Sequence, residues 1–382
     1  MRSIFLCGLC AFAAPLAAAQ NTSQPLPSSD LAGVIAPAIQ GVPKIFLPDF
    51  GIAADVAYQI SSLTKKDPRY DNGSIDEPQL RDGQLVAFSP IDPYANAQFT
   101  IDLPNGGAAN IEEAWLYFDK LPMDVDVRLG RFLPQFGLLD LTNTFQLAML
   151  NRPSAIGNYI GSDGMDVSGA EANFYIPNPW ELNLKADLNA VAGDALGGAA
   201  QKGALAYLAT LDYSGDFLTT GSIEAGASAA QGPSPYGLAE TLVDPYFQIQ
   251  YAPSQRRVWT WSVEGMLAER QGMGSADLKK SVYTFLDYNF AIFYHLGFLV
   301  DVADLPGPLS AVSYPGAFPD AFAGAPSYGT QVSLAPNFTW FVSDNTRLRL
   351  QYTHATPVGS ERPNETASFQ VTFSLGNLKQ LN

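Results

Sequence analysis

The sequence predicts an all-β protein, a 16-stranded antiparallel transmembrane β-barrel with short periplasmic turns and long extracellular loops. Three observations carry this prediction. The chain begins with the pattern of an exported protein. Segments of about ten residues in which apolar and polar residues alternate recur from residue 49 onward. The connections between these segments are alternately short and long. We therefore expect the barrel to occupy residues 49–382.

The N-terminus has the layout of a secretory signal peptide. Arg2 precedes an apolar run that ends at Leu16, and three alanines then supply a small-residue cleavage site before Gln20. We expect residues 1–19 to form this signal. Residues 20–48 are rich in Pro, Ser and Ala and are expected to form a short periplasmic segment.

Composition excludes several classes of protein. The chain has 21 Lys and Arg against 37 Asp and Glu, a formal net charge of −16, which argues against a nucleic-acid partner. Both cysteines, Cys7 and Cys10, lie in the predicted signal, so no disulfide or thiolate metal site is expected in the exported chain. The longest later apolar run, 290–300, is broken by His295 and Gly297 and is too short for a transmembrane helix.

Sixteen segments show the two-residue alternation of a half-buried strand. In one of them Ala97, Phe99 and Ile101 alternate with Gln98 and Thr100. An even number of such strands brings both ends of a barrel to the turn side. The segments are 50–60, 83–91, 95–103, 111–120, 124–136, 166–176, 180–192, 203–213, 217–230, 242–252, 257–269, 281–289, 291–302, 328–341, 346–356 and 367–376.

The connections separate the two ends of the predicted barrel. Those after even-numbered segments are tight, whereas those after odd-numbered segments are mostly long, the longest being 61–82, 137–165, 270–280 and 303–327. A water-soluble sandwich would show the same alternation with its apolar side buried. Aromatic residues near the tight turns favour the barrel instead, because such girdles mark membrane interfaces. They are Tyr94, Trp180, Tyr251, Trp259, Trp261, Tyr288, Phe338 and Trp340.

The hairpin over 111–137 shows how the faces are assigned. Ala114, Leu116 and Phe118 form an apolar row expected to face lipid, and Glu113 belongs to the polar row expected to face water. Strict alternation directs Arg131 toward lipid. Either a bulge turns it into the lumen or its long side chain reaches the rim.

The same hairpin, "EEAWLYFDKLP" followed by "VDVRLGRFLPQFG", resembles one in the phosphate-selective group of outer-membrane porins. The resemblance implies a 16-stranded channel, often a homotrimer, whose long loop after this hairpin folds inward and narrows the pore. The chain departs from that group in lacking a clear ladder of lumen Arg and Lys, and in ending with residues 377–382 instead of an aromatic residue. The matching positions are Glu113, Ala114, Leu121, Pro122, Arg128, Gly130, Arg131, Phe132, Phe136 and Gly137.

Charged residues in the polar rows are candidates for the pore lining. Carboxylates in a pore favour cations and basic side chains favour anions, so the excess of acids predicts weak cation selectivity. Alternatively, these charges only pair across strands and keep the wall wetted. The acids are Asp55, Glu113, Asp126, Glu171, Asp187, Glu224, Asp244, Glu264, Asp287 and Asp301, and the bases are Arg128, Lys185, Arg347 and Arg349.

The long connection 137–165 is the candidate constriction loop. It carries apolar residues that need burial, namely Leu147, Met149, Leu150 and Ile156, and a long loop of this kind usually has a folded position. The alternative is an ordered cap outside the pore. Its charged constriction candidates are Asp140, Arg152 and Asp163.

We expect a passive diffusion channel for small hydrophilic solutes or ions in the outer membrane of a Gram-negative bacterium, surrounded by lipid, with no reaction and no cofactor or metal. A phosphate-type anion channel is the first alternative. A phospholipase-like enzyme using His354 and Thr356 on the lipid face is less favoured, because threonine is a poor nucleophile and no third group is evident. A TonB-dependent receptor needs a larger chain, and a channel for hydrophobic solutes needs apolar inner rows.

Overall fold

The computed structural model describes residues 48–62, 77–103, 108–193, 195–196, 204–233, 239–254, 256–270, 277–304, 330–357 and 363–376. The predicted signal peptide (1–19) and, apart from Pro48, the predicted periplasmic segment (20–48) lie outside the described residues. So does most of the long connection 303–327. The description below concerns the unit from Ile45 to Asn382.

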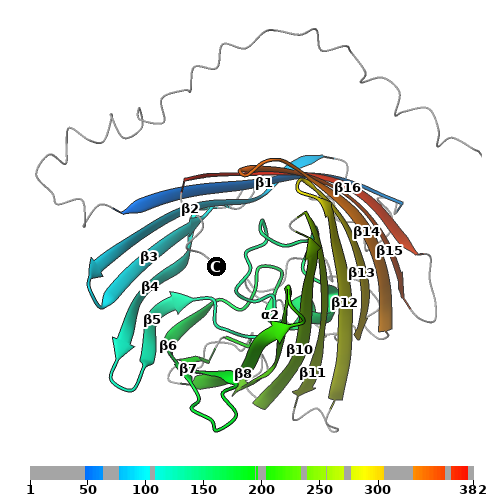
Figure 1. Cartoon of the computed structure of the whole chain (residues 1–382). Coiled ribbons are helices and arrows are strands. Elements are labelled where there is room, and N and C mark those ends of the chain that lie inside the picture. Colours follow the sequence, from blue (N-terminus) through cyan, green and yellow to red (C-terminus); the bar gives the residue numbers. More distant parts are fainter. Residues whose placement is uncertain are drawn as a thin grey trace, which may run out of the picture. The chain divides into compact units, whose positions relative to one another are not determined.

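Sixteen antiparallel strands form one closed barrel (Figure 1), which confirms the predicted fold class. Each strand pairs with its neighbours in the chain, and β1 pairs with β16 to close the ring. Because a closed ring has no edge, every strand has a partner on both sides. The strands are β1 (Asp49–Ser61), β2 (Pro78–Asp92), β3 (Ala95–Asp102), β4 (Asn110–Leu121), β5 (Val125–Phe132), β6 (Val167–Tyr175), β7 (Asn183–Ala192), β8 (Leu205–Phe217), β9 (Gly221–Pro233), β10 (Ala239–Ser254), β11 (Arg257–Arg270), β12 (Asp277–Ala291), β13 (Tyr294–Asp304), β14 (Thr330–Ser343), β15 (Thr346–Pro357) and β16 (Asn364–Gly376).

All sixteen predicted segments are strands, but some boundaries differ. The segment predicted over 124–136 ends as a strand at Phe132, because Pro134 cannot donate to a β-ladder and the chain turns inward there. β2 and β12 begin several residues earlier than predicted. Strand ends are hard to predict because the pairing partner decides them.

The two faces of the wall differ as the alternation predicts. Outward apolar side chains are exposed, for example Leu296 at 49% and Leu350 at 55%, whereas the inward polar side chains of Thr100 and Gln370 are 0% and 1% exposed. A water-soluble β-protein would bury the first set and expose the second. The reversal is that of a membrane barrel.

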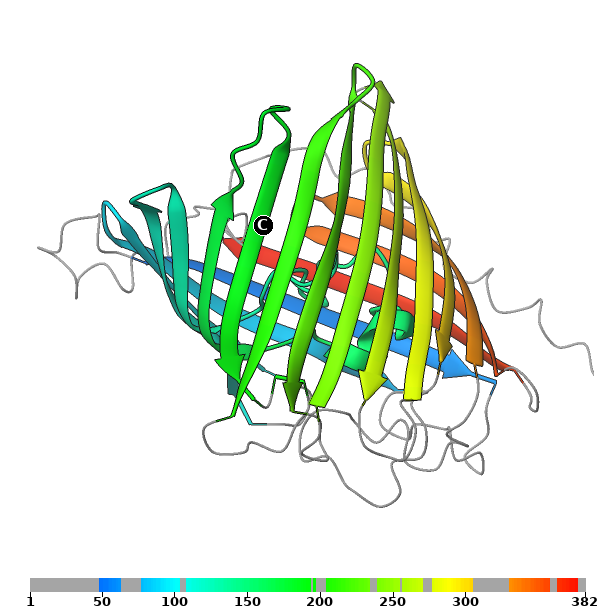
Figure 2. The same cartoon turned by 90° about the horizontal axis from the view of Figure 1, so that it is seen from below.

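Short turns gather at one end of the barrel, at the top in Figure 2. Aromatic side chains pack together beside them: Trp259 stacks on Tyr288 at 3.8 Å between ring centroids, and Tyr294 stacks against Phe338 and Trp340. These contacts join β11–β12 and β13–β14 on the outer face, as expected for an interfacial girdle. In the described part of the chain, no helix has both the length and the apolar composition to cross a membrane.

Two β-bulges interrupt the ladder at the loop end. In the β1–β2 pair Asp55 lies opposite Asp82, but Val56 lies opposite Leu80, so Arg81 is an extra residue. In the β3–β4 pair Thr100 lies opposite Glu113, but the next pair skips Glu112. A bulge re-aims side chains, and here it lets two consecutive charged residues leave the usual alternation.

Candidate functional site

The connection between β5 and β6, residues 133–166, lies inside the barrel and is called the inward loop here. Figure 1 shows it within the ring of strands. It contains the short helix α2 (Ser154–Ile160). The alternative of a cap outside the pore is therefore wrong. Its four predicted apolar residues are all buried: Leu147, Met149, Leu150 and Ile156 are at most 2% exposed.

The loop enters the lumen through hydrogen bonds to inward side chains of the wall. Thr210 Oγ1 of β8 donates to the carbonyl of Gln135 at 2.6 Å. The amide of Leu138 donates to Glu264 Oε1 of β11 at 2.9 Å, and Tyr283 of β12 donates to the other oxygen of that carboxyl at 2.6 Å. Glu264, a predicted lining residue, is thus an anchor of the loop.

Gly137 allows this approach. Its φ is +65°, and a Cβ at this position would lie 2.0 Å from Glu264 Oε1 and 2.6 Å from Asp244 Oδ2. Only glycine combines this backbone conformation with so close a contact. The two carboxyl groups therefore meet over the backbone of the loop.

The helix α2 is capped by the wall of the barrel. Asp301 on β13 accepts hydrogen bonds from the amides of Ser154 at 2.8 Å and Ala155 at 3.0 Å. Pro153 precedes the helix and makes no side-chain cap, so a distant carboxylate satisfies the free amides of the first turn. The helix is thereby fixed against β13.

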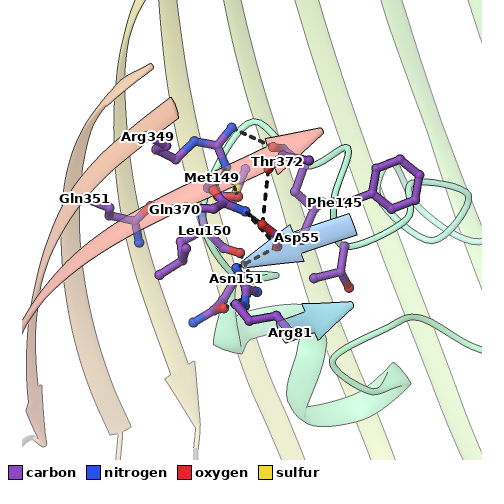
Figure 3. Close-up of polar contacts among 12 residues, drawn as sticks. Asp55, Arg81, Phe145, Met149, Leu150, Asn151, Arg349, Gln351, Gln370 and Thr372 are labelled. Carbon is purple, nitrogen blue, oxygen red and sulfur yellow. Dashed lines mark hydrogen bonds and ion pairs between the residues drawn. The ribbon is translucent and has the colours of Figure 1, made fainter. Parts of the chain in front are cut away.

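Arginines hold the far part of the loop (Figure 3). Arg347 on β15 donates to the carbonyls of Phe145 and, at 3.1 Å, Leu147. Arg349 on the same strand donates to the carbonyls of Leu147, at 2.8 Å, and Met149. Arg349 is 2% exposed, so its charge is largely withdrawn from the lumen water.

Arg81 on β2 completes this contact, as Figure 3 also shows. It donates to the carbonyl of Leu150 and to Asn151 Oδ1, both at 2.8 Å, and pairs with Asp55 at 3.2 Å. The loop thus crosses the lumen from β5 to the wall formed by β15, β16, β1 and β2. Arg81 was not predicted to face the lumen. Its inward position depends on the bulge in β2, which cannot be recognised from the alternation of residues in one strand.

Two of the three constriction candidates stabilise the loop itself. Arg152 donates to the carbonyls of Leu139 and Thr142, and Asp140 accepts the amide of Met165 at 2.6 Å. Burial raises the pKa of the Asp140 carboxyl to about 7, although the charge of Arg152 opposes that shift. The third candidate, Asp163, is exposed and accepts Thr144 Oγ1 at 2.9 Å.

An apolar core joins the loop to the barrel wall. The inner face is apolar at the loop end of β7–β13, because the inward loop covers these positions with its own apolar side chains. The core consists of Phe132, Phe136, Leu147, Met149, Ala155, Ile156, Ile160, Met165, Val167, Val191, Leu196, Ala206, Leu208, Ala230, Leu242, Met266, Ala268, Tyr283, Phe285, Leu299 and Ala335.

The other predicted lining residues mostly have partners on neighbouring strands. Arg128 pairs with Glu171 at 2.8 Å, directly across the β5–β6 ladder, whereas Lys185 pairs with Asp187 at 3.1 Å within β7 itself. Tyr117 donates to Asp126 at 2.7 Å. Glu113 accepts Gln98 Nε2 at 2.6 Å, and Asp287 contacts His295 Nδ1 at 2.8 Å. Pairing across strands, the alternative given above, therefore describes much of this wall.

Arg131 stays on the outward row. No register shift occurs at this residue in either ladder of β5, so no bulge turns it inward. Its guanidinium forms an ion pair with Asp166 at the loop end, where the Arg131 side chain is 41% exposed. It thus lies at the rim.

The outer face carries a further polar group at the loop end. His354 Nε2 lies 3.0 Å from Thr356 Oγ1, and its Nδ1 lies 3.7 Å from Glu365 Oε1 on β16. Glu365 could not be predicted as a third group, because only the pairing of β15 with β16 brings it beside His354. Among the described residues, no group of three His, Cys, Asp or Glu is placed to hold a metal ion.

Comparison with known proteins shows the fold. No protein family model matches the chain. An uncharacterized protein of Aquifex aeolicus is 26% identical over 161 residues, and the match spans 38% of this chain and 34% of that protein.

Solved outer-membrane channels superpose on most of the chain. OprB of Pseudomonas putida, in a high-pH structure, has a TM-score of 0.62 at 11% identity, covering 91% of this chain and 97% of that one. An anion-selective porin from Comamonas acidovorans has a TM-score of 0.57 at 12% identity, covering 86% and 98%. The outer membrane channel DcaP of Acinetobacter baumannii has a TM-score of 0.54 at 12% identity, covering 86% and 96%. The chain has the fold of the outer-membrane porins; the phosphate-selective group stays a prediction.

Proposed function

We propose that the protein is a passive diffusion channel for small hydrophilic solutes or ions in a Gram-negative outer membrane. The observation that carries this proposal is a closed 16-stranded barrel with an apolar outer row and a polar inner row, whose lumen holds an ordered loop. Sixteen strands enclose more space than side chains can fill. The inward loop narrows that space in this proposal, and the predicted signal peptide supplies the export route.

Weak cation selectivity is part of the proposal. Arg347 and Arg349 donate to loop carbonyls, so the basic groups that would attract phosphate are already bonded. Glu171 and Asp187 on β6 and β7 are paired with bases, and the carboxylates on β2–β4 and on β8–β9 add further negative charge to the lumen wall. An excess of carboxylates favours cations over anions in a pore. The phosphate-type alternative is correspondingly weakened.

Reversal potentials across planar bilayers under a salt gradient test the selectivity. We expect the sign of the reversal potential to show that cations permeate more readily than anions. A clear preference for anions would contradict the proposed cation selectivity. Deleting residues 145–160 tests the loop: single-channel conductance should rise, and an unchanged conductance would mean that the loop does not narrow the path. A protein that forms no pores under any of these conditions would overturn the channel itself.

Two further points remain predictions with their own tests. The resemblance implies a homotrimer. After cross-linking in mild detergent, the protein should then migrate on a gel at the mass of three chains. The His354 group is tested by phospholipid hydrolysis. We expect none, because His354 and Glu365 are separated by 3.7 Å and threonine is a weak nucleophile; hydrolysis that is lost in His354→Ala would favour the enzyme.

A further inference from the structure

Three carboxyl groups converge at the loop end of neighbouring strands β2, β3 and β4. They are Asp82, Asp102 and Glu112, and together with Asp163 of the inward loop they are called the acidic cluster here. Gln84 of β2 links the three wall residues: it lies opposite Asp102 in the β2–β3 ladder, donates to Glu112 Oε2 at 2.6 Å, and follows Asp82 by two residues. Asp163 acts electrostatically on all three. The inward loop and the barrel wall thus both contribute acidic side chains to the acidic cluster.

The two bulges create this arrangement. Arg81 and Asp82 occupy one bulge and Glu112 and Glu113 the other, so each bulge adds a charged side chain that regular alternation would not place in the lumen. Bulges of this kind are concentrated next to functional sites.

Arg81 acts electrostatically on Asp82 and Asp163 and so offsets the charge of the cluster only in part. Arg81 pairs with Asp55 at 3.2 Å and donates to Leu150 and Asn151 of the loop. Glu113 adds a further negative charge beside Glu112, although its own oxygens accept bonds from Gln98, Thr100 and Trp115. The cluster is therefore a region of the lumen in which acidic side chains outnumber basic ones.

Gln84 is an independent sign that this place binds a ligand. Its side chain is aimed into the cluster, since its Nε2 donates to Glu112 Oε2 at 2.6 Å, and the residue is 2% exposed. Its amide oxygen has no hydrogen-bond partner, and neither has Oδ1 of Asp82, which is 7% exposed. Buried polar atoms are normally satisfied, so two open acceptors two residues apart on β2 indicate a donor that comes from outside.

The chemistry of these atoms limits the ligand. The open groups are all oxygen acceptors, which excludes an anion. In the described part of the chain, no three acidic or histidine residues are close enough to chelate a metal ion. A primary ammonium group fits better, because it carries positive charge and three N–H donors that can reach separated acceptors.

We propose that the acidic cluster, together with Gln84, is a transient binding site for organic cations with primary ammonium groups. The proposal rests on the proposed channel function and names the solutes that the channel favours. A site in a conducting pore must attract its solute and still release it. The solute donates N–H bonds to Asp82 and Gln84 while the other carboxylates hold its charge.

Current block by 1,4-diaminobutane in planar bilayers tests this site. We expect concentration-dependent block of the wild-type channel, and about tenfold weaker block in Asp82→Asn/Glu112→Gln. The matched control is Asp212→Asn/Glu224→Gln, which removes two inward carboxylates of β8 and β9 near the turns; its block should stay within about twofold of wild type.

A second variant separates hydrogen bonding from charge. Gln84→Leu removes an acceptor but no charge, so weaker block in this variant shows that the probe is hydrogen-bonded at this position. Heat-dependent migration on gels checks that each barrel is folded. If the double variant does not fold, Asp102→Asn alone replaces it, with the same direction expected.

The contrary outcomes are distinct. Equal weakening in both double variants would mean general attraction by lumen charge and would overturn the site. Block by Ca²⁺ but not by the diamine would make it a metal site instead. A wild-type channel that conducts without diamine block overturns this inference and leaves the proposed function intact, whereas absence of any conductance overturns both.

Discussion

The two sides of the inward loop meet very different walls. Toward β8–β15 the loop is bonded: apolar side chains interlock, Asp301 caps α2, and Arg347 and Arg349 bind its carbonyls. Toward β2–β4 Arg81 also bonds it, but beyond Arg81 the loop presents Asp163 to a wall of carboxylates with two open acceptors. One side of the loop is attached, and the other borders the space that we propose solutes use.

The difference shows that an inward position does not by itself make a residue part of the pore. Glu264 and Asp301 face inward like Asp82, yet they anchor a loop. A lumen charge contributes to selectivity only where water and solute still reach it. The predictions below test whether the two sides are as different as their contacts indicate.

The largest effect is expected from Arg347→Gln/Arg349→Gln. A charge-assisted hydrogen bond contributes about 1.5–3 kcal/mol, so, counting one bond for each arginine, the attached side should lose at least about 3–6 kcal/mol of the free energy that holds residues 145–149 in place. Single-channel conductance should rise. Lys185→Gln removes one positive charge from β7, where the base pairs with Asp187 instead of the loop, and is compared with Arg349→Gln alone, which also removes one. Equal conductance changes in these two single variants would show that lumen charge, not loop position, is responsible.

Gly137→Ala should act next most strongly. The added Cβ would overlap Glu264 Oε1, and a non-glycine residue in this conformation costs about 1–3 kcal/mol. The start of the loop should shift, with a lower unfolding temperature and more frequent current fluctuations. Gly157→Ala in α2 is the control, since its nearest contacts would be an ordinary 3.8 Å away. Similar destabilisation by both would refute a special role for Gly137.

Asp301→Ala removes the cap of α2 from the opposite wall. Loss of a capping carboxylate typically costs about 0.5–2 kcal/mol, so the helix should exchange its amide hydrogens faster while the strands keep their protection. Mass spectrometry of hydrogen exchange over 150–165 measures this change. Protection equal to that of wild type would show that the core around Ile156 alone fixes the helix.

The smallest effect concerns pH and Asp140. Its pKa is raised to about 7 from 3.8 by burial, so the protonated carboxyl favours the folded loop. This stabilisation is complete below pH 3.8 and is lost as the pH rises through about 7, by at most about 1.4 kcal/mol per pH unit for one proton. The rate of amide hydrogen exchange in the inward loop, corrected for the intrinsic pH dependence of exchange, should increase from pH 5 to 8. Asp140→Asn should abolish that pH dependence; its persistence would assign it to another group.

The fold itself could be predicted from local pattern. Sixteen alternating segments, short and long connections in turn, and aromatic residues beside the turns are properties of each strand and its immediate neighbours. The need to bury Leu147, Met149, Leu150 and Ile156 correctly indicated that the long loop has a folded position. It did not say where, because burial can be satisfied inside a barrel or against its outside.

The sequence by itself therefore determined the number of strands, the two faces of the wall, and which long loop has a folded position. The tertiary structure decided which inward residues hold the loop and which border open space. The physical reason is distance along the chain: Arg349 binds a carbonyl 200 residues away, and Gln351 accepts an amide 201 residues away. Likewise, the bulges that place Arg81 and Glu112 exist only in the register between paired strands, which no single strand records.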